Sequence, residues 1–215
     1  MIKKIFLPLL LVLIGSSISH ALFIDLVHEL DGNSDGSVSY GTITVTEIGG
    51  GDLRFEITAE PTALGSPLAD IHELYFNLLN DVPATDLLVS DFTPTTLGPI
   101  SSVETPLTIA GAPNDLFEYG INFGNGGGPA YRFTSVAFTL SASVDLFISH
   151  LLETSDPNNT GPVTMAVHFQ ETAIFGDDSE TIGGSPGIPI PEPTTMLLFS
   201  TGLVGLLGFI RKNGK

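Results

Sequence analysis

The stretch that decides the fold is Val38–Glu47, VSYGTITVTE, followed by the turn Gly49-Gly50-Gly51-Asp52 and by Leu53–Ile57, LRFEI. The first segment is rich in β-branched residues, which are favoured in strands. The second alternates apolar and polar side chains, and this period of two is typical of a strand with one buried face. The sequence therefore predicts two strands of a half-buried sheet, separated by a glycine-rich turn.

The same two patterns recur along the chain. Alternation is found at 117–123 and 165–169, and further strands are expected at 74–79, 86–92 and 131–140. Clusters of turn-forming residues at 97–99, 111–115 and 124–129 separate them. Seven or more short strands joined by such turns predict an all-β fold, a single β-sandwich domain of jelly-roll type.

One segment has the spacing of a helix. Its apolar side chains recur at intervals of three and four residues, after Ser141 or Ser143, and they belong to Val144, Phe147, Ile148, Leu151 and Leu152. Pro157 follows soon afterwards. We therefore expect one short amphipathic helix that caps the sandwich.

The N-terminus has the composition of an export signal. Two lysines precede the apolar run Ile5–Ile14, and small residues follow at Ser19 and Ala21, the two positions that a signal peptidase requires. We expect residues 1–21 to be a signal peptide that signal peptidase removes after Ala21. An uncleaved signal anchor is the alternative.

The rest of the chain divides into a domain and a tail. The β-sandwich domain is expected at 22–175, which is long enough to build one hydrophobic core. Residues 176–190 are rich in glycine, proline and acidic residues, and this composition predicts a linker.

Residues 22–190 are strongly acidic. They hold 23 of the 24 aspartate and glutamate residues but two of the seven lysine and arginine residues, Arg54 and Arg132, which we expect to pair with carboxylates. Such a surface repels phosphate backbones, so nucleic acid is excluded as a partner. The charge serves solvation or, alternatively, the binding of divalent cations or a cationic polymer. Because the chain has no cysteine, the fold depends on its core alone.

The C-terminus combines three signals in order. Pro191, Glu192 and Pro193 form a rigid, extended motif, because proline fixes φ and removes backbone donors. Residues 194–210 then carry no charge, and these 17 positions would cover about 25 Å as a helix, which is just enough to cross a bilayer. The basic residues that follow, which hold the C-terminus on the cytoplasmic side, are Arg211, Lys212 and Lys215.

This tail, residues 191–215, closely resembles the PEP-CTERM sorting signal of Gram-negative bacteria. The resemblance implies that an exosortase, a membrane-embedded Cys-dependent enzyme, recognises Pro191, Glu192 and Pro193 and removes the helix. It also implies export across the inner membrane, an anchored precursor, and release or attachment at the cell surface. The same tail has been labelled an ice-binding protein C-terminal domain, which describes a tail and not an activity. An ordinary C-terminal anchor with a proline-rich stalk is the alternative.

A candidate calcium site lies near the start of the domain. Asp31, Asn33 and Asp35 alternate as in the first half of a calcium loop, where side-chain oxygens converge on the ion. The twelfth position, which should be a bidentate glutamate, is Thr42. Because aspartate and asparagine also favour plain turns, a turn without metal is the alternative. Calcium is the one cofactor that the sequence suggests.

The sequence offers no catalytic residues that we would assign, and we expect the protein not to be an enzyme. Gly183–Gly187 matches the G-x-S-x-G pattern of hydrolases, but no strand is predicted before it and Pro186 blocks a helix after it. His28, His72 and His150 each have an acidic residue nearby in sequence, and no pair has zinc-site spacing. His168 alternates with core positions, so we expect it to face solvent.

Two features point weakly to surface binding. Thr42, Thr44 and Thr46 share one strand face, as in ice-binding arrays, and an ordinary exposed sheet face explains them equally. Several aromatic residues between Phe117 and Phe138 would suit sugar stacking, although most are expected in the core. We therefore expect an acidic surface or extracellular-matrix protein, with exopolysaccharide as a partner. A carbohydrate- or calcium-binding module is the first alternative, and a hydrolase with a scattered site is the second.

Overall fold

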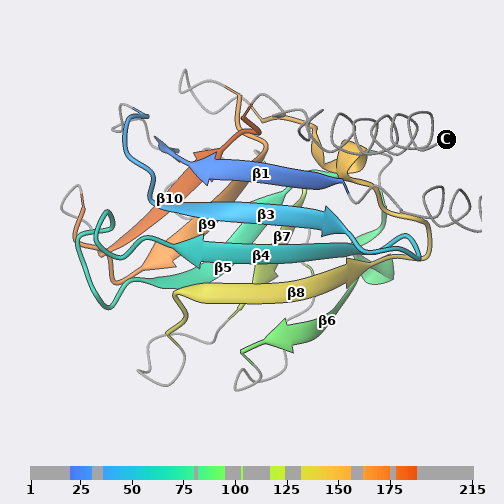
Figure 1. Ribbon diagram of the computed structural model, residues 1–215, viewed down its shortest axis with the longest axis horizontal. Helices are drawn as coiled ribbons and strands as arrows, with labels where there is room; N and C mark the ends of the chain where they lie inside the picture. Colours follow the sequence, from blue (N-terminus) through green and yellow to red (C-terminus); the bar gives the residue numbers. More distant parts are fainter. Residues whose placement is uncertain are drawn as a thin grey trace, which may run out of the picture.

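The computed structural model describes residues 20–30, 36–79, 82–94, 103, 117–123, 132–155, 162–174 and 178–187. These residues form two antiparallel five-stranded sheets, packed face to face (Figure 1). The prediction of an all-β sandwich is therefore confirmed.

The first sheet has the strand order β1-β3-β4-β8-β6. Its strands are β1 (Ala21–Leu26), β3 (Gly41–Glu47), β4 (Leu53–Ala59), β8 (Ser135–Ser141) and β6 (Leu88–Thr93). The predicted segment at its centre forms the β3–β4 hairpin, in which Glu47 pairs with Leu53. Gly49, Gly50 and Gly51 in the turn all have φ between 72° and 84°, a conformation that glycine adopts without steric cost.

The second sheet has the order β2-β10-β9-β5-β7. Its strands are β2 (His28–Glu29), β10 (Ser179–Gly184), β9 (Met165–Gln170), β5 (Asp70–Phe76) and β7 (Tyr119–Asn122). Strand β5 begins four residues before the predicted start at Leu74. Asp70 and Ile71, which are both buried, belong to the strand as well. Two successive buried residues lack the alternation that marks a strand in sequence, and for this reason the prediction started the strand too late.

The core lies between the sheets and is built from alternate residues of each strand. Phe55 on β4 and Phe138 on β8 are opposite each other and stack with their ring centroids 4.9 Å apart. Phe76 on β5 places its ring 6.2 Å from Phe55 and so joins the two sheets. Each of these three side chains is fully buried, which contributes about 1.5 to 3 kcal/mol per side chain.

The amphipathic helix expected around 144–152 is replaced by a single 3-10 turn, η3 (Ile148–Leu151). Leu146 and Leu151 are buried here, whereas Val144, Phe147 and Leu152 are exposed. The apolar spacing therefore does not correspond to one buried helix face. A second 3-10 turn, η1 (Ala84–Asp86), precedes β6 and was not predicted.

Tertiary contacts hold the backbone on both sides of η3, and the backbone conformation between them is not that of an α-helix. The Leu146 amide donates to the carbonyl of Gly51 in the β3–β4 turn, at 2.8 Å. The carbonyl of His150 accepts a hydrogen bond from the Leu79 amide, also at 2.8 Å. Phe147, in the middle of the segment, has an extended backbone with φ of −129° and ψ of 153°, so no α-helix runs through it.

The linker prediction for 176–190 is wrong over Ser179–Gly184, which form β10 in the second sheet. The two glycines that resemble a linker are packing positions. A Cβ at Gly183 would lie 2.5 Å from Val163, and one at Gly184 would lie 2.1 Å from the Asp25 carbonyl. The strand therefore requires glycine because the neighbouring backbone approaches closely.

Candidate functional site

Most of the predicted site residues lie outside the described part of the chain. They are the calcium candidates Asp31, Asn33 and Asp35, the sorting motif Pro191, Glu192 and Pro193, and the basic residues Arg211, Lys212 and Lys215. Ala21, the expected cleavage position, is described and is the first residue of β1. Among the described residues, no three acidic or histidine side chains are grouped so that they could hold a metal ion.

The second sheet carries a polar cluster that the sequence did not predict. We call it the histidine cluster, and its members are His72, Glu73, Tyr75, Asn122, His168 and Thr181. A register shift in β5 creates it: Ile71 pairs with Phe169 and Glu73 pairs with His168, so His72 is the extra residue. The rings of His72 and His168 meet edge to face, with their centroids 5.9 Å apart.

Glu73 is the anion of the histidine cluster, and its carboxylate oxygens are engaged. The amide of Asn122 on β7 donates to Oε1 at 2.9 Å, and the hydroxyl of Tyr75 donates to Oε2. On the other side, Nδ1 of His168 lies 2.9 Å from Oγ1 of Thr181 on β10. These contacts connect β7, β5, β9 and β10 across the sheet.

Burial decides the charge of the cluster. Burial lowers the pKa of His72, and the charge of Glu73 opposes this shift. Burial also lowers the pKa of His168, where Glu73 opposes the shift and His72 adds to it. Burial first, and then the hydrogen bond to Glu73, raises the pKa of Tyr75. At neutral pH both imidazoles and the phenol of the cluster are therefore neutral.

His168 was expected to face solvent, but its side chain is partly buried in this cluster. The sequence signal was its alternation with core residues, which correctly places it on the outer face of the strand. The contact with His72 depends on the bulge in β5, and His72 lies 96 residues before His168, so no local pattern encodes it. The cluster joins strands through hydrogen bonds.

The segment that matches G-x-S-x-G does not have the geometry of a nucleophile elbow. Gly183 and Gly184 belong to β10, and the hydroxyl of Ser185 donates to the carbonyl of Pro162. Pro186 then forms an isolated antiparallel bridge with Ile24 of β1. A nucleophile elbow turns from a strand into a helix, whereas this segment leaves one sheet and meets the edge of the other.

The two arginines of the domain have different partners. Arg132 pairs with the carboxylate of Glu171, as expected. Arg54 instead donates from Nη1 to the backbone carbonyl of Asp91, at 2.8 Å. The residues that the two arginines contact both have an unusual backbone conformation, with φ of 50° at Asp91 and 53° at Glu171. Each arginine thus contacts a strand break that has a left-handed conformation.

A buried carboxyl lies beside the second of these ion pairs. Asp70 begins β5 and is buried. Burial, with a further contribution from Glu171, raises the pKa of Asp70 to about 6, and the Arg132 charge opposes the shift. This carboxyl therefore changes its charge close to neutral pH.

The outer face of the first sheet is polar, with one exposed ring. Thr42, Thr44 and Thr46 alternate with the buried core positions of β3 and share this face. Phe23 lies opposite Thr44 on β1 and is 54% exposed. By contrast, the described aromatic residues expected to be mostly core are indeed buried, and they are Phe117, Tyr119, Phe123, Phe133 and Phe138.

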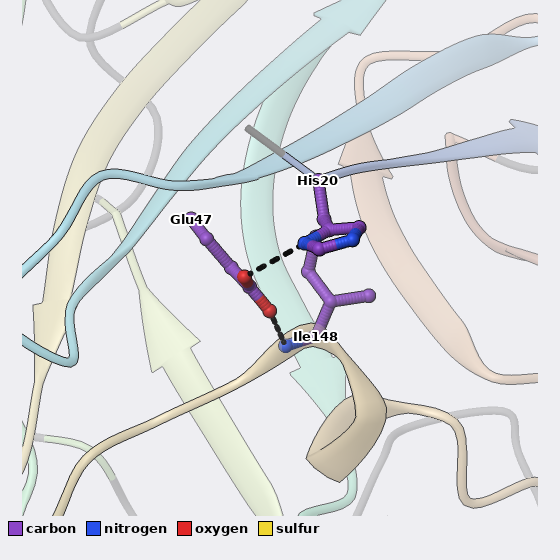
Figure 2. A network of polar contacts seen from close by, with 3 residues as sticks. All are labelled: His20, Glu47 and Ile148. Atoms are coloured by element: carbon purple, nitrogen blue, oxygen red, sulfur yellow. Dashed lines mark hydrogen bonds and ion pairs between the residues drawn. The ribbon is translucent and has the colours of Figure 1, made fainter. Parts of the chain in front are cut away.

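A small network connects the start of β1 to η3 (Figure 2). The carboxylate of Glu47, at the end of β3, accepts a hydrogen bond from the Ile148 amide at 3.0 Å. Its other oxygen lies 3.3 Å from Nδ1 of His20, and the Glu47 amide donates to the His20 carbonyl. The N-terminal end of the domain is therefore fixed beside η3.

None of the helices in the described part of the chain has the length and apolar character of a membrane span. Residues 194–210, for which a membrane helix is predicted, lie outside that part.

Comparison with known proteins identifies the tail. A family model described as the PEP-CTERM protein-sorting motif matches residues 189–212. No curated protein and no solved structure matches the chain. The matched range contains the Pro-Glu-Pro motif, the uncharged segment and the first two basic residues. The chain therefore carries a C-terminal PEP-CTERM sorting signal of the kind that an exosortase processes, and it is an exported protein.

Proposed function

We propose that this protein is a non-enzymatic, acidic component of the cell surface or extracellular matrix, delivered by its sorting signal. The observation that carries the proposal is the match of residues 189–212 to the sorting motif, behind a β-sandwich domain. In the exported precursor, residues 194–210 hold the chain in the membrane until an exosortase acts at the Pro-Glu-Pro motif. Signal peptidase removes residues 1–21.

The chemistry of the domain supports a structural role. Both arginines of residues 22–190 contact acceptors of the same domain, so the acidic surface is left with little positive charge. A net negative surface keeps an exported domain hydrated and soluble. The histidine cluster ties four strands together and therefore stabilises the sheet.

Processing is tested by the mass of the natural protein. In a host that encodes an exosortase, we expect a product that lacks residues 1–21 and the C-terminal helix, and deletion of the exosortase gene should leave the precursor in the membrane. Glu192→Ala should have the same effect, whereas the matched substitution Glu153→Ala, outside residues 189–212, should be processed. A product that retains Met1 and Lys215 in that host would overturn the proposal.

A second candidate function is carbohydrate binding on the outer face of the first sheet. Phe23 favours it, because an exposed ring beside Thr44 and Asp25 can stack on a sugar while the polar neighbours bind its hydroxyls. A glycan array with the processed domain tests it. Binding that Phe23→Ser abolishes and Phe147→Ser leaves unchanged would support this function, and equal loss in both variants would count against it.

Calcium binding at Asp31, Asn33 and Asp35 is tested in the same preparation. Added calcium should raise the melting temperature of the domain if the loop binds the ion, because a ligand of the native state stabilises it. Asp31→Asn serves as the control. An unchanged melting temperature removes calcium from the function.

A further inference from the structure

The point at which the chain leaves the described domain defines one end of the sandwich. Pro186 pairs with Ile24 in an antiparallel bridge, so the chain after Pro186 runs toward the start of β1. That start lies beside η3, as the contact between Glu47 and Ile148 shows (Figures 1 and 2). We call this end, which holds the start of β1, the β3–β4 turn and η3, the exit end.

The exit end also collects exposed apolar side chains. The large apolar residues of the described chain that are exposed and lie there are Ile48, Leu79, Leu88, Val144, Phe147 and Leu152. Ile48 belongs to the β3–β4 turn, and Val144, Phe147 and Leu152 surround η3. Two contacts place the others: the Leu79 amide donates to the His150 carbonyl, and Leu88 pairs with Ser141 at the end of β8.

The opposite end of the sandwich differs. Among the described residues, the exposed large apolar side chains at that end are Val38 and Leu68, just before the starts of β3 and β5. Single exposed apolar side chains are normal, whereas six described ones at the exit end make that end a candidate contact surface. The asymmetry between the two ends is therefore informative.

The length of the tether restricts what this partner can be. Seven Cα–Cα steps separate Gly187 from Thr194, the first residue of the uncharged segment, and they span at most about 25 Å. A seven-residue strand is itself about 23 Å long. If residues 194–210 are in the bilayer, the domain is held within about 25 Å of the membrane surface. The tether starts beside the middle of β1, because Pro186 bridges Ile24, and it runs toward the exit end, so we expect that end to face the membrane.

We propose that the exit end rests on the membrane surface in the unprocessed protein, with Ile48, Phe147 and Leu152 in contact with zwitterionic phospholipid. The inference rests on the proposed function, because it requires the anchor. Tethering makes the contact intramolecular, so a weak apolar contact is populated that free domains in solution would not show. Removal of the tail by the exosortase then ends the contact and releases the domain from the membrane surface.

The acidic residues of the exit end favour contact with zwitterionic over anionic lipid. Asp52, Asp145 and Glu153 lie in the turn and around η3, so an anionic headgroup would be repelled. A zwitterionic surface offers ammonium groups to these carboxylates while the apolar side chains enter the interface. Contact should therefore weaken as the fraction of anionic lipid increases, and salt should reduce that dependence.

The chain allows a clean measurement because it contains no tryptophan. Phe147→Trp and Leu68→Trp, each in the chain from Leu22 to Lys215, place single reporters at the two ends, on side chains that are 45% and 48% exposed. Each chain is reconstituted in phosphatidylcholine nanodiscs whose acyl chains are brominated, and bromine quenches tryptophan fluorescence on contact. We expect at least twofold stronger quenching for Phe147→Trp than for Leu68→Trp, and less quenching when phosphatidylglycerol is added.

The outcomes separate this inference from the proposed function. If the chains stay on the discs but the two reporters are quenched equally, or neither is quenched, the membrane contact is overturned while the anchor stands. A preference of the exit end for the exosortase or for a second copy of the chain would give this same unquenched result. If the chains do not stay on the discs, the anchor fails, and both proposals fall together. Ile48→Ser with Leu152→Ser, added to Phe147→Trp, should reduce its quenching.

Discussion

Arg132 donates from Nη2 to the carboxylate of Glu171, and Glu171 itself has φ of 53°, in the left-handed region that side chains other than glycine rarely adopt. Glu171 directly follows β9, where the chain turns away from the sheet. The ion pair therefore holds a strained residue at a strand end. In the other sheet, Arg54 contacts the backbone of Asp91, which has nearly the same φ.

Arg132→Met should destabilise the domain modestly. The side chains of the pair are 27% and 35% exposed, and ion pairs that solvent reaches contribute about 1 kcal/mol or less. We expect a decrease of about 1 kcal/mol in the free energy of unfolding, measured by urea denaturation. Glu171→Gln is the matched control and should show a similar loss. A loss above about 3 kcal/mol in either variant would mean that the pair behaves as a buried one.

Asp91→Gly should stabilise the domain. Arg54 contacts the carbonyl of Asp91 and not its side chain, so glycine retains this hydrogen bond and removes the cost of the positive φ. We expect a gain of about 0.5 to 1 kcal/mol, observed as a higher melting temperature. Glu171→Gly provides the contrast, because it relieves the same strain but loses the carboxylate that Arg132 binds. A loss of stability in Asp91→Gly would contradict this account.

The histidine cluster should make the domain less stable in mild acid. The pKa values of His72 and His168 are lowered in the folded state, so the unfolded chain binds more protons once the pH falls below the usual histidine value of 6.5. Stability therefore decreases as the pH falls through this range. In His168→Gln, which can still bond to Thr181, the decrease should be smaller. Melting temperatures between pH 7.5 and 5 measure the difference, and identical profiles would refute it.

Asp70 should have the opposite effect. Its pKa is raised to about 6 in the folded state, from the usual aspartate value of 3.8, so the folded protein binds the proton more tightly. This contribution to stability is fully present below pH 3.8 and is lost as the pH rises to about 6. Asp70→Asn removes it, so the variant should lose stability more steeply than the natural protein as the pH falls from 6 to 4. Parallel profiles over that range would show that Asp70 does not titrate there.

The strand pattern and the sorting signal are both local properties of the sequence. LRFEI shows period two because β4 has one face on the core and one in solvent, and this face requirement is met by neighbouring residues alone. Pro191, Glu192 and Pro193, with the uncharged segment and the basic end, likewise form a signal that adjacent residues complete. For this reason the all-β fold and the sorting signal could both be predicted from the sequence.

The tertiary structure decided the rest, because those features depend on groups far apart in the chain. Gly183 and Gly184 have the composition of a linker, but in the fold they lie in a strand, where the Val163 side chain and the Asp25 backbone leave no room for a Cβ. His72 meets His168 through a register shift, and a shift depends on the packing of both strands at once. The apolar side chains around η3 have helical spacing, yet the backbone is extended at Phe147, so no single helix face forms and Val144, Phe147 and Leu152 are exposed at the exit end.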